Sequence, residues 1–432
     1  MTHIEHRQKD FRQRLDKICA TSALPPPEVS RAVAEIIAAV REQGDAAVLH
    51  YTALHDHARL SSKQMRVPPA TLDKAVAALP ADFRKALDEA RANVRDYYAG
   101  TVPKSWERRN SHGARVGEVF HPIRRCGLYI PGGQAPLVST VLMTAVPAAL
   151  AGVPQIVACT PPRPDGLPAA PVLAALRLCG VEEVYAIGGA QAIAALAIGT
   201  ESIAGVDKVF GPGNAYVCEA KRQVFGEAGV DLLPGPSEVM VISDGSTPAE
   251  WAAASILAQA EHGTGRERTF LIAPPEFIRE VLKAVEIQLV PLPRKEQIRR
   301  ALDLLVTIVT AGAAQTIEIA NRIAPEHLEL HTAPEAAAEF AAKIVTAGAI
   351  FIGPHSPTVL GDFVAGPSHT LPTARTGRFL SGLQVGDFMR RTSIVEYTPD
   401  ALRKAASAVE AFAKMEQLEA HGRSLTIRLE TE

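Results

Sequence analysis

Short apolar, β-branched runs alternate with helical stretches over most of the chain. Six of these runs end in a turn, and we predict them to be strands: 155–160, 183–187, 207–210, 239–243, 269–273 and 349–353. Their apolar residues run together, which is typical of strands covered on both faces. Strands that alternate with helices predict an α/β fold with mostly parallel sheets.

The two ends of the chain have helical patterns. Apolar residues recur at helical spacing at Val33, Ile36, Ile37 and Val40, and residues 1–99 are therefore expected to be helices. Near the other end, Thr398 is a favoured N-cap and Pro399 a favoured first helical residue. We expect this last helix to continue until Gly422, which suits a left-handed cap.

Composition narrows the classes of protein that need to be considered. The 432 residues are 47% hydrophobic and 21% charged, which is typical of a folded globular chain. Lys and Arg number 45 against 47 Asp and Glu, so the net charge of -2 does not favour a nucleic acid or an acidic membrane as partner. The five cysteines form no CxxC pair, which argues against disulfides and thiolate zinc knuckles. The polar start lacks the apolar stretch of a signal peptide, and the longest apolar stretch is short for a membrane span, so a cytoplasmic location is expected.

Three glycine-rich segments have the character of strand-to-helix turns. IGGAQA at 187–192 and FGPGNA at 210–215 each open an expected helix, and YIPGG at 129–133 lies upstream of them. Glycines let backbone N–H groups approach a ligand, and helix N-termini attract phosphate. None of the three is a GxGxxG motif or a P-loop, and each alone is typical of any α/β protein. Together they favour a nucleotide site and ordinary tight turns about equally.

Two pairs of polar residues have the chemistry of a metal or acid–base site. Gln259 and His262 are three residues apart near a helix end and share a helix face. An amide oxygen and an imidazole nitrogen can both bind a borderline divalent cation. Glu326 and His327 join a carboxylate to an imidazole, which suits proton transfer near neutral pH. On spacing alone, a solvated helix end for the first pair and a solvated helix-to-strand junction for the second are favoured.

Further candidates lie in loops and at the end of the chain. Asp362 and His369 lie in a Gly- and Pro-dense segment that is typical of an ordered loop, where they serve either a metal and a substrate or the loop backbone. Ser237 precedes an expected strand and is either a turn cap or a substrate donor. It has no GxSxG around it, and no cysteine lies in a nucleophile motif. Glu416 and His421 do not share a helix face, and periodicity alone predicts that both are solvated.

Taken in order, long blocks of this sequence resemble the histidinol dehydrogenase family. The blocks are GLYIPGGQAPLVSTVLM, IGGAQAIAALAIGTESI, VDKVFGPGNAYVCEAKRQVFG, PGPSEVMVISD, AQAEH, NRIAPEHLEL and GDFVAGPSHTLPT, within a resemblance that extends from about residue 29 to about residue 429. Each short motif is weak by itself. Their occurrence in one chain in this order is specific.

The resemblance implies an α/β fold with two Rossmann-like, incompletely doubly wound parallel-sheet domains and small helical end segments. It implies an N-terminal helical segment at 1–26 and a first α/β domain made of 27–128 and 240–380. A second α/β domain, which binds NAD, follows at 129–239, and a C-terminal dimerisation tail at 381–432.

The resemblance also implies a zinc- and NAD-dependent enzyme. Members oxidise L-histidinol through L-histidinal to L-histidine with two NAD, and they are homodimers in which the tail reaches the partner's site. By matching motifs, one zinc ion per subunit would be bound by Gln259, His262, Asp362 and His421. Glu326 and His327 would be the acid–base pair. Ser237, His369 and Glu416 would contact the amino alcohol together with His327 and the zinc ligands, and Tyr129, Gln191 and Asn214 would contact NAD.

Two alternatives stay open at this point. The family commonly reads GPNH before the substrate histidine, whereas this chain has Ser368 in the third position of that motif. A paralogue that applies the same zinc and NAD chemistry to another small alcohol, such as a sulfonated diol, is therefore the second hypothesis. A non-catalytic nucleotide- or metabolite-binding protein on the same scaffold is the third, and the presence of every expected ligand and acid–base residue argues against it.

Overall fold

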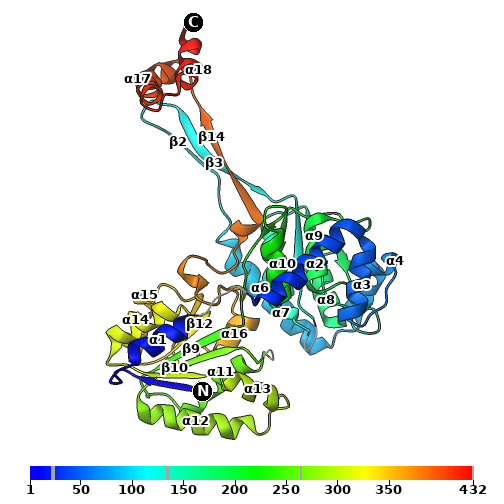
Figure 1. Cartoon of the computed structure of the whole chain (residues 1–432), viewed down its shortest axis with the longest axis vertical. Helices are drawn as coiled ribbons and strands as arrows, with labels where there is room; N and C mark the ends of the chain where they lie inside the picture. The colour runs from blue at the N-terminus through cyan, green and yellow to red at the C-terminus, as the bar shows by residue number, and fades with distance from the viewer. Residues whose placement is uncertain (21–24, 133–135, 263–264, 431–432) are drawn as a thin grey trace.

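Two parallel β-sheets carry the fold, and helices cover both faces of each (Figure 1). The computed structural model describes residues 1–20, 25–132, 136–262 and 265–430. One sheet has six strands in the order β1-β11-β10-β9-β12-β13, and the other has five in the order β6-β5-β4-β7-β8. All neighbours within these two sheets are parallel. The predicted α/β class with two parallel-sheet domains is confirmed.

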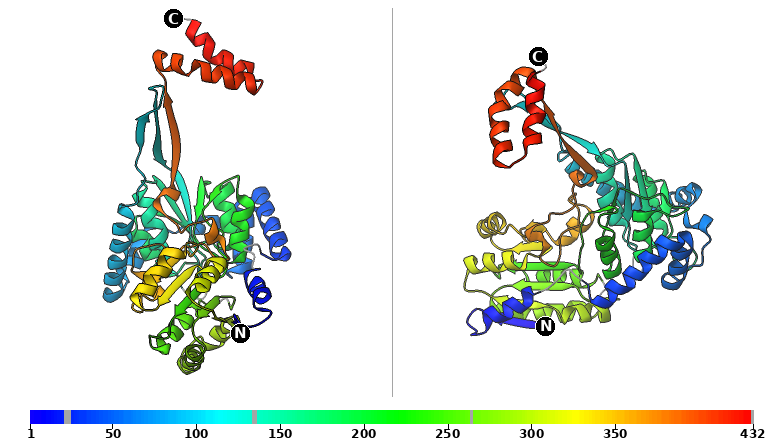
Figure 2. Two further views of the ribbon diagram at one scale, coloured as in Figure 1. Left: turned by 90° about the vertical axis from the view of Figure 1, so that its left-hand side faces the viewer. Right: turned by 45° about the horizontal axis from the view of Figure 1, so that its top comes forward.

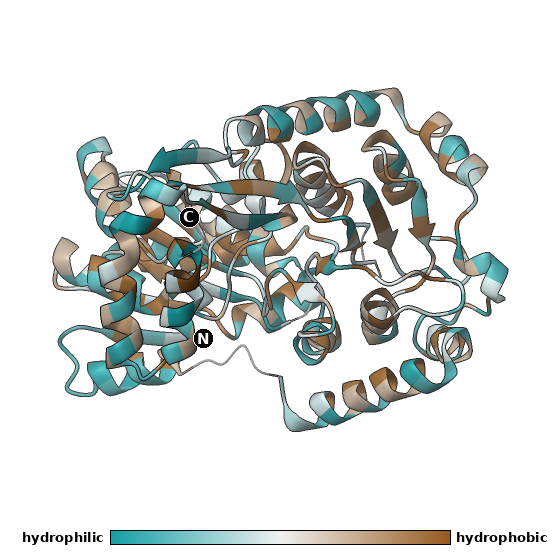
Figure 3. Cartoon of the chain, turned by 90° about the horizontal axis from the view of Figure 1, so that it is seen from above, coloured by the Kyte–Doolittle hydropathy of each residue, from teal (hydrophilic) through white to brown (hydrophobic). Residues whose placement is uncertain are grey.

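The six predicted strands are all present, within a residue or two of the expected bounds. The six-stranded sheet consists of β1 (Thr2–Glu5), β9 (Glu238–Ser243), β10 (Arg268–Ile272), β11 (Val306–Val309), β12 (His327–His331) and β13 (Ala349–Ile352). The five-stranded sheet consists of β4 (Arg125–Tyr129), β5 (Gln155–Cys159), β6 (Glu183–Tyr185), β7 (Lys208–Phe210) and β8 (Gly229–Val230). Every residue of β4, β9 and β12 is buried, as expected for strands covered on both faces. The strands of the five-stranded sheet are correspondingly brown in the right half of Figure 3.

The six-stranded sheet separates two apolar layers. One contains α11 (Ala249–Ala260), α12 (Pro275–Leu289) and α13 (Lys295–Leu302), and the other contains α1 (Phe11–Cys19), α14 (Ala313–Ile323) and α15 (Pro334–Lys343). Strand alternation sends neighbouring side chains to opposite layers, so Val241 packs with α11 while Met240 and Ile242 pack with α14. The short helix α16 (Thr358–Phe363) follows β13.

The early helices pack on the five-stranded sheet, which differs from the predicted division of the chain. The helices of this domain are α2 (Pro27–Gln43), α3 (Asp45–His55), α4 (Ser62–Met65), α5 (Pro69–Ala77), α6 (Ala81–Ala99), α7 (Val138–Leu150), α8 (Ala170–Leu178), α9 (Gly189–Ile198) and α10 (Ala215–Val224). Val33 and Ile36 of α2 share a core with Ile193 of α9, and Leu87 of α6 shares one with Leu128 of β4. Residues 27–99 therefore do not belong with 240–380, because their apolar faces are buried against the other sheet.

The start of the chain is also not purely helical. Residues Thr2–Glu5 form β1, which pairs in parallel with β11 at the edge of the six-stranded sheet, and only then does α1 begin. The strand has four residues, of which Ile4 alone is buried. A segment this short shows no alternation in the sequence, so its pairing with a distant strand was not predictable.

The C-terminal segment leaves the two domains on a long antiparallel sheet. Strand β14 (Met389–Glu396) pairs along its whole length with β3 (Arg115–Pro122), which also pairs with β2 (Trp106–Arg109). The segment between β13 and β14 contains two short 3-10 helices, η1 (Thr376–Arg378) and η2 (Val385–Phe388). Figure 2 shows this sheet projecting from the body and ending in the helices α17 (Pro399–Met415) and α18 (Glu419–Glu430). We call residues 389–430 the tail.

The predicted last helix begins as expected but ends early. The Thr398 side chain accepts a hydrogen bond from the Ala401 amide, and Pro399 is the first helical residue. Helix α17 stops at Met415, because Gln417 takes a left-handed conformation (φ 58°) and the Leu418 amide donates to the carbonyl of Ala413. This position is usually glycine, so a glutamine here gave no stop signal. Among the described residues, no helix combines the length and apolar composition needed to cross a membrane.

Candidate functional site

The acid–base pair lies at the amino end of the six-stranded sheet. Helix α14 ends at Ile323, Ala324 is left-handed (φ 50°), and the chain turns at Pro325 into β12. In the neighbouring strand β9, Val239 is opposite His327, which places Glu238 beside Glu326. The predicted helix-to-strand junction is confirmed, but its side chains do not meet water: Glu326 is 5% exposed and His327 is 3% exposed.

Glu326 is a buried carboxyl that is held by two donors from the start of β9. The Ser237 hydroxyl donates to Oε2 of Glu326 at 2.6 Å, and the Glu238 amide donates to the same oxygen at 2.8 Å. Burial raises the pKa of Glu326 to about 8, although these two hydrogen bonds lower it. A carboxyl with a pKa near 8 can give and take a proton around neutral pH, which is the property of a general acid or base.

Three histidines near this carboxyl are oriented in the same way. The Nδ1 of His327 lies 3.0 Å from the carbonyl of Glu238, that of His369 lies 3.2 Å from the carbonyl of Asp362, and that of His262 lies 3.2 Å from the carbonyl of Gln259. A carbonyl only accepts, so each Nδ1 carries the hydrogen and each Nε2 is left as an acceptor. Burial lowers the pKa of His327 and of His369, which favours neutral rings with a basic Nε2.

His369 links the two domains. Its Nε2 lies 3.4 Å from the hydroxyl of Thr140, which is on α7 of the five-stranded domain. Thr140 was not among the predicted residues, and a threonine inside an apolar helix gives no functional signal in the sequence. A cavity of about 380 Å³ is lined by His327 and His369 together with Tyr98 and Phe351.

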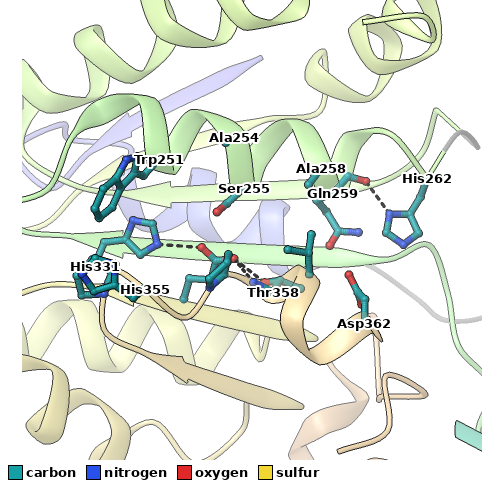
Figure 4. Close-up of a pocket in the computed structure, with 14 residues that line it drawn as sticks. Trp251, Ala254, Ser255, Ala258, Gln259, His262, His331, His355, Thr358 and Asp362 are labelled. Carbon is teal, nitrogen blue, oxygen red and sulfur yellow. Dashed lines mark hydrogen bonds and ion pairs between the residues drawn. The ribbon is translucent and has the colours of Figure 1, made fainter. Parts of the chain in front are cut away.

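The candidate metal ligands of the body line a second cavity, of about 480 Å³ (Figure 4). Gln259, on α11, His262, just beyond it, and Asp362, on α16, lie at one end of this cavity. Gln259 is 3% exposed, and its Nε2 has no hydrogen-bond partner among the described residues. The Nδ1–H of His262 is held by a backbone carbonyl, which is how proteins orient a metal-binding imidazole. These residues fit a divalent ion of borderline character.

This set is incomplete within one chain. Among the residues that the structure describes, no three His, Cys, Asp or Glu side chains gather closely enough to hold a metal ion. An ion at this point therefore needs the amide of Gln259 and a further ligand from elsewhere. Glu416 lies in the turn after α17 and His421 lies on α18, both exposed at the far end of the projecting tail (Figure 1). The fold does not bring these two predicted residues to the body of their own chain.

The three candidate NAD residues lie at the carboxyl edge of the five-stranded sheet. Tyr129 ends β4, and its hydroxyl accepts a hydrogen bond of 3.1 Å from the Gly189 amide at the start of α9. Gln191 is 1% exposed, and within the described part of the chain neither Oε1 nor Nε2 of its amide group has a hydrogen-bond partner. Asn214 caps α10, where its Oδ1 accepts from the amides of Tyr216 and Val217. The chain reverses strand order between β4 and β7, which is where α/β sheets bind ligands.

Two further buried polar residues, Glu329 and His331, lie in strand β12 of the six-stranded sheet. Strand β12 reads HLELH, so His327, Glu329 and His331 alternate with leucines and lie on one face. Leu328 and Leu330 pack in the opposite apolar layer. Glu329 is 0% exposed and His331 is 2% exposed, and both line the cavity of Figure 4. The alternation of polar and apolar residues is visible in the sequence, but the burial of the polar residues, which makes the alternation unusual, is not.

Of the three glycine-rich turns, Gly133 of the first lies outside the described residues.

The raised pKa of Glu326 predicts how the metal-free protein responds to pH. In the unfolded chain this carboxyl ionises near 4.5, and in the folded chain near 8. Between these values the folded state retains the proton and the unfolded state does not, so stability falls as pH rises through this window. Glu326→Gln cannot ionise and keeps an acceptor for Ser237 and Glu238. With a chelator present, the Glu326→Gln substitution is expected to raise the midpoint of thermal unfolding more at about pH 8 than at about pH 5. An equal increase of the midpoint at the two pH values would contradict the raised pKa of Glu326.

Comparisons with known proteins agree with this geometry. The sequence profile of the family described as histidinol dehydrogenase matches residues 21–429. Histidinol dehydrogenase of Cereibacter sphaeroides is 44% identical over 99% of this chain and 98% of its own length, and that of Rhizobium meliloti is 47% identical over 93% and 92%. The crystal structure of histidinol dehydrogenase from Elizabethkingia anophelis superposes with a TM-score of 0.93 at 32% identity, covering 100% of this chain and 98% of its own. The chain belongs to the histidinol dehydrogenase family.

Proposed function

We propose that this chain oxidises L-histidinol through L-histidinal to L-histidine, using two NAD and one zinc ion per subunit. Membership of an oxidoreductase family supports the reaction class. The observation that carries the proposal is the arrangement of Glu326, His327 and the residues Gln259, His262 and Asp362. A buried acid–base pair and an incomplete set of nitrogen and oxygen ligands lie at one end of the same sheet, where an alcohol bound to a divalent ion would meet a proton acceptor.

The charges around the cavities favour an amino alcohol over an acidic substrate. The cavity of Figure 4 is lined by the carboxyl groups of Asp362 and Glu329, and both cavities are lined by histidines. Among the described residues, no Lys or Arg lines either cavity. A protonated amine is favourable beside these carboxylates, whereas a sulfonate would meet them with the proposed divalent ion, and no described Lys or Arg of the lining, as its counter-charge. A sulfonated diol therefore has no support here.

His327 is the proposed base of the first oxidation. Its Nδ1–H is held by the Glu238 carbonyl, so Nε2 is free to take the proton of the substrate hydroxyl. Its lowered pKa keeps the ring neutral and ready to accept at neutral pH. The hydride leaves the carbon that bears this hydroxyl, and the alcohol becomes the aldehyde. His369 and Ser237 are the proposed contacts that orient the substrate beside this base.

Glu326 is the proposed base of the second oxidation. The aldehyde must add water before another hydride can leave. The ionised form of this carboxyl, whose fraction grows as the pH approaches its pKa of about 8, can take a proton from that water. The Ser237 hydroxyl and the Glu238 amide hold one oxygen of this carboxyl, so its orientation is set before substrate enters. No cysteine thioester is needed, and the cysteines are in fact buried thiols, apart from the partly exposed Cys179.

The two bound groups would supply the rest of the chemistry. A divalent ion bound by Gln259, His262, Asp362 and His421 supplies a Lewis acid for the alcohol oxygen. NAD bound by Tyr129, Gln191 and Asn214 supplies the hydride acceptor. The orphaned amide of Gln191 is the observation that supports the second assignment. The first is supported by the position of Gln259, His262 and Asp362 at one end of the same cavity.

A homodimer with exchanged tails would complete the site. His421 and Glu416 are exposed at the end of the tail, far from the body of their own chain (Figure 1). Phe412 is 68% exposed and Met415 is 83% exposed on the same helix pair. Apolar side chains this exposed are typical of a surface that a partner covers. We infer that the tail of one subunit docks beside the cavity of Figure 4 in the other and provides His421 as the missing ligand.

The proposed reaction predicts a fixed product ratio. Purified protein with zinc and NAD should convert L-histidinol to L-histidine with two NADH formed per histidine, because two hydrides leave one carbon. Histidine is counted by chromatography and NADH by absorbance. Absence of turnover of L-histidinol, with another small alcohol oxidised, would contradict the substrate assignment but not the zinc and NAD chemistry.

The role of His327 predicts a particular kinetic change. His327→Asn keeps a donor near the Glu238 carbonyl but removes the basic nitrogen. We expect kcat to fall by about 10²–10⁴-fold and KM to change little, because a base acts mainly in the transition state. Steady-state rates with L-histidinol measure both constants. A KM that rises while kcat is retained would assign His327 to binding instead.

The exchanged tail predicts complementation between two inactive variants. His262→Asn damages the body and His421→Asn damages the tail, so each homodimer has two damaged sites. If the tails cross, a heterodimer of the two has one site with both changes and one site with neither. Differently tagged subunits, co-expressed and purified through both tags, should therefore regain activity. Heterodimers that are isolated intact and remain inactive would contradict the crossing.

A further inference from the structure

Glu329 is a fully buried carboxylate that the proposed mechanism does not use. It lies in the middle of β12 and is 0% exposed. The Nε2–H of His331 donates to its Oε2 at 2.9 Å, and the amide and hydroxyl of Thr358 donate to its Oε1 at 2.6 and 2.7 Å. The side chain of Ser255 also acts on this carboxylate, because it lowers the pKa of Glu329 and lines the same cavity. Figure 4 shows the bonds to His331 and Thr358 as dashed lines beside the cavity.

These hydrogen bonds hold a charge where it is otherwise unfavourable. Burial acts to raise the pKa of Glu329, but the hydrogen bonds from His331 and Thr358, together with the side chain of Ser255, lower it below its ordinary value. The group is therefore a buried anion at neutral pH. Hydrogen bonds to an ionised acceptor are shorter and stronger than neutral ones, so this carboxylate joins its three neighbours firmly.

The neighbours belong to the two helices that carry the candidate metal ligands. Ser255 is on α11, four residues before Gln259, and Thr358 is the first residue of α16, four residues before Asp362. Residues four apart lie one above the other on the same helix face. The carboxylate of Glu329 thus contacts each helix one turn away from its ligand and on the ligand's side. Ser255, Gln259, Thr358 and Asp362 all line the same cavity.

We propose that Glu329 is a positioning residue for the divalent-ion site, a clamp that sets the separation between α11 and α16 and hence between Gln259, His262 and Asp362. Strand β12 is an inner strand of the six-stranded sheet, so the clamp fixes both helices to that sheet. The inference rests on the proposed metal site and not on the identity of the alcohol. It gives the polar row of β12 two parts: His327 for proton transfer, and Glu329 with His331 for support of the ligands.

A clamp and an ordinary buried hydrogen-bond network differ in what they change. Loss of an ordinary network lowers the stability of the metal-free fold and leaves the affinity for the ion as it was. Loss of a clamp lets the ligands move apart, so that the affinity falls and the geometry around the ion changes. Partners that orient metal ligands are worth about 10–100-fold in affinity.

The test removes one donor on each side of Glu329 and leaves the carboxylate in place. Ser255→Ala removes the hydroxyl on α11, and Thr358→Val removes the hydroxyl on α16 while its backbone amide still donates. Zinc affinity is measured in the full-length protein by competition with a coloured chelator, and the geometry is followed by the absorption spectrum of bound Co²⁺. Each variant is expected to bind zinc about 10-fold more weakly and to shift the Co²⁺ spectrum. Thermal unfolding in chelator reports the stability of the metal-free fold separately.

A matched control is available in the other domain. Glu219 on α10 is also a buried carboxylate, 1% exposed, and it accepts hydrogen bonds from Ser30, Arg222 and Gln223. Glu219→Gln disturbs a comparable network far from α11 and α16, so it is expected to lower stability without changing zinc affinity or the Co²⁺ spectrum. His262→Asn identifies the ion that is measured, because it removes a proposed ligand.

The outcomes separate the clamp from the metal site. Weaker zinc binding and an altered Co²⁺ spectrum in Ser255→Ala and Thr358→Val, with Glu219→Gln unchanged, support the clamp. Wild-type zinc affinity and an unchanged spectrum in both variants overturn it, whatever happens to stability. Protein that binds no zinc, or that binds it equally well as His262→Asn, overturns the proposed metal site and the clamp together.

Discussion

The parallel pairing of β9 with β12 is the constraint on which the site depends. Because Val239 lies opposite His327, the first residues of the two strands are placed side by side. Ser237 and the Glu238 amide then reach Glu326, while the Glu238 carbonyl holds His327. A shift of one residue would send these side chains to the opposite face of the sheet. The backbone of a central, fully buried strand thus sets the orientation of both proposed bases before any ligand binds.

The two domains present opposite edges to the chemistry. In the five-stranded sheet the candidate NAD residues lie at the carboxyl edge, as in most nucleotide-binding α/β folds. In the six-stranded sheet the candidate ligands and bases lie at the amino end, because α11 runs back along the sheet and ends there with Gln259 and His262. The contact between His369 and Thr140 joins the two domains beside these bases. The proposed hydride transfer across this junction would require the two domains to keep their relative positions, and the helices with the candidate ligands to keep theirs.

Much of the fold and of the candidate site could be predicted from the sequence, and the features that could not be predicted have identifiable physical reasons. The apolar runs located six strands because buried strands need continuous apolar residues, and the ordered motifs gave the family. The division of the chain was not predictable, since the apolar face of α2 does not reveal which sheet it covers. Gln417 ended a helix without the usual glycine. For the site, spacing alone predicted that Glu326 and His327 face water, because burial depends on packing with β9 that no local pattern shows. The same holds for Glu329, whose burial also depends on packing that the local sequence does not show.

The central claim is that three side chains from two helices, completed by a tail, hold one divalent ion beside two buried bases. Anomalous diffraction at the zinc edge, from crystals of the zinc-loaded full-length protein, tests it most directly. The account predicts a single strong peak per subunit between Gln259, His262 and Asp362, with His421 of the partner subunit as a further ligand. A peak elsewhere in the chain, or an intact tail docked away from a zinc-free cavity, would contradict it.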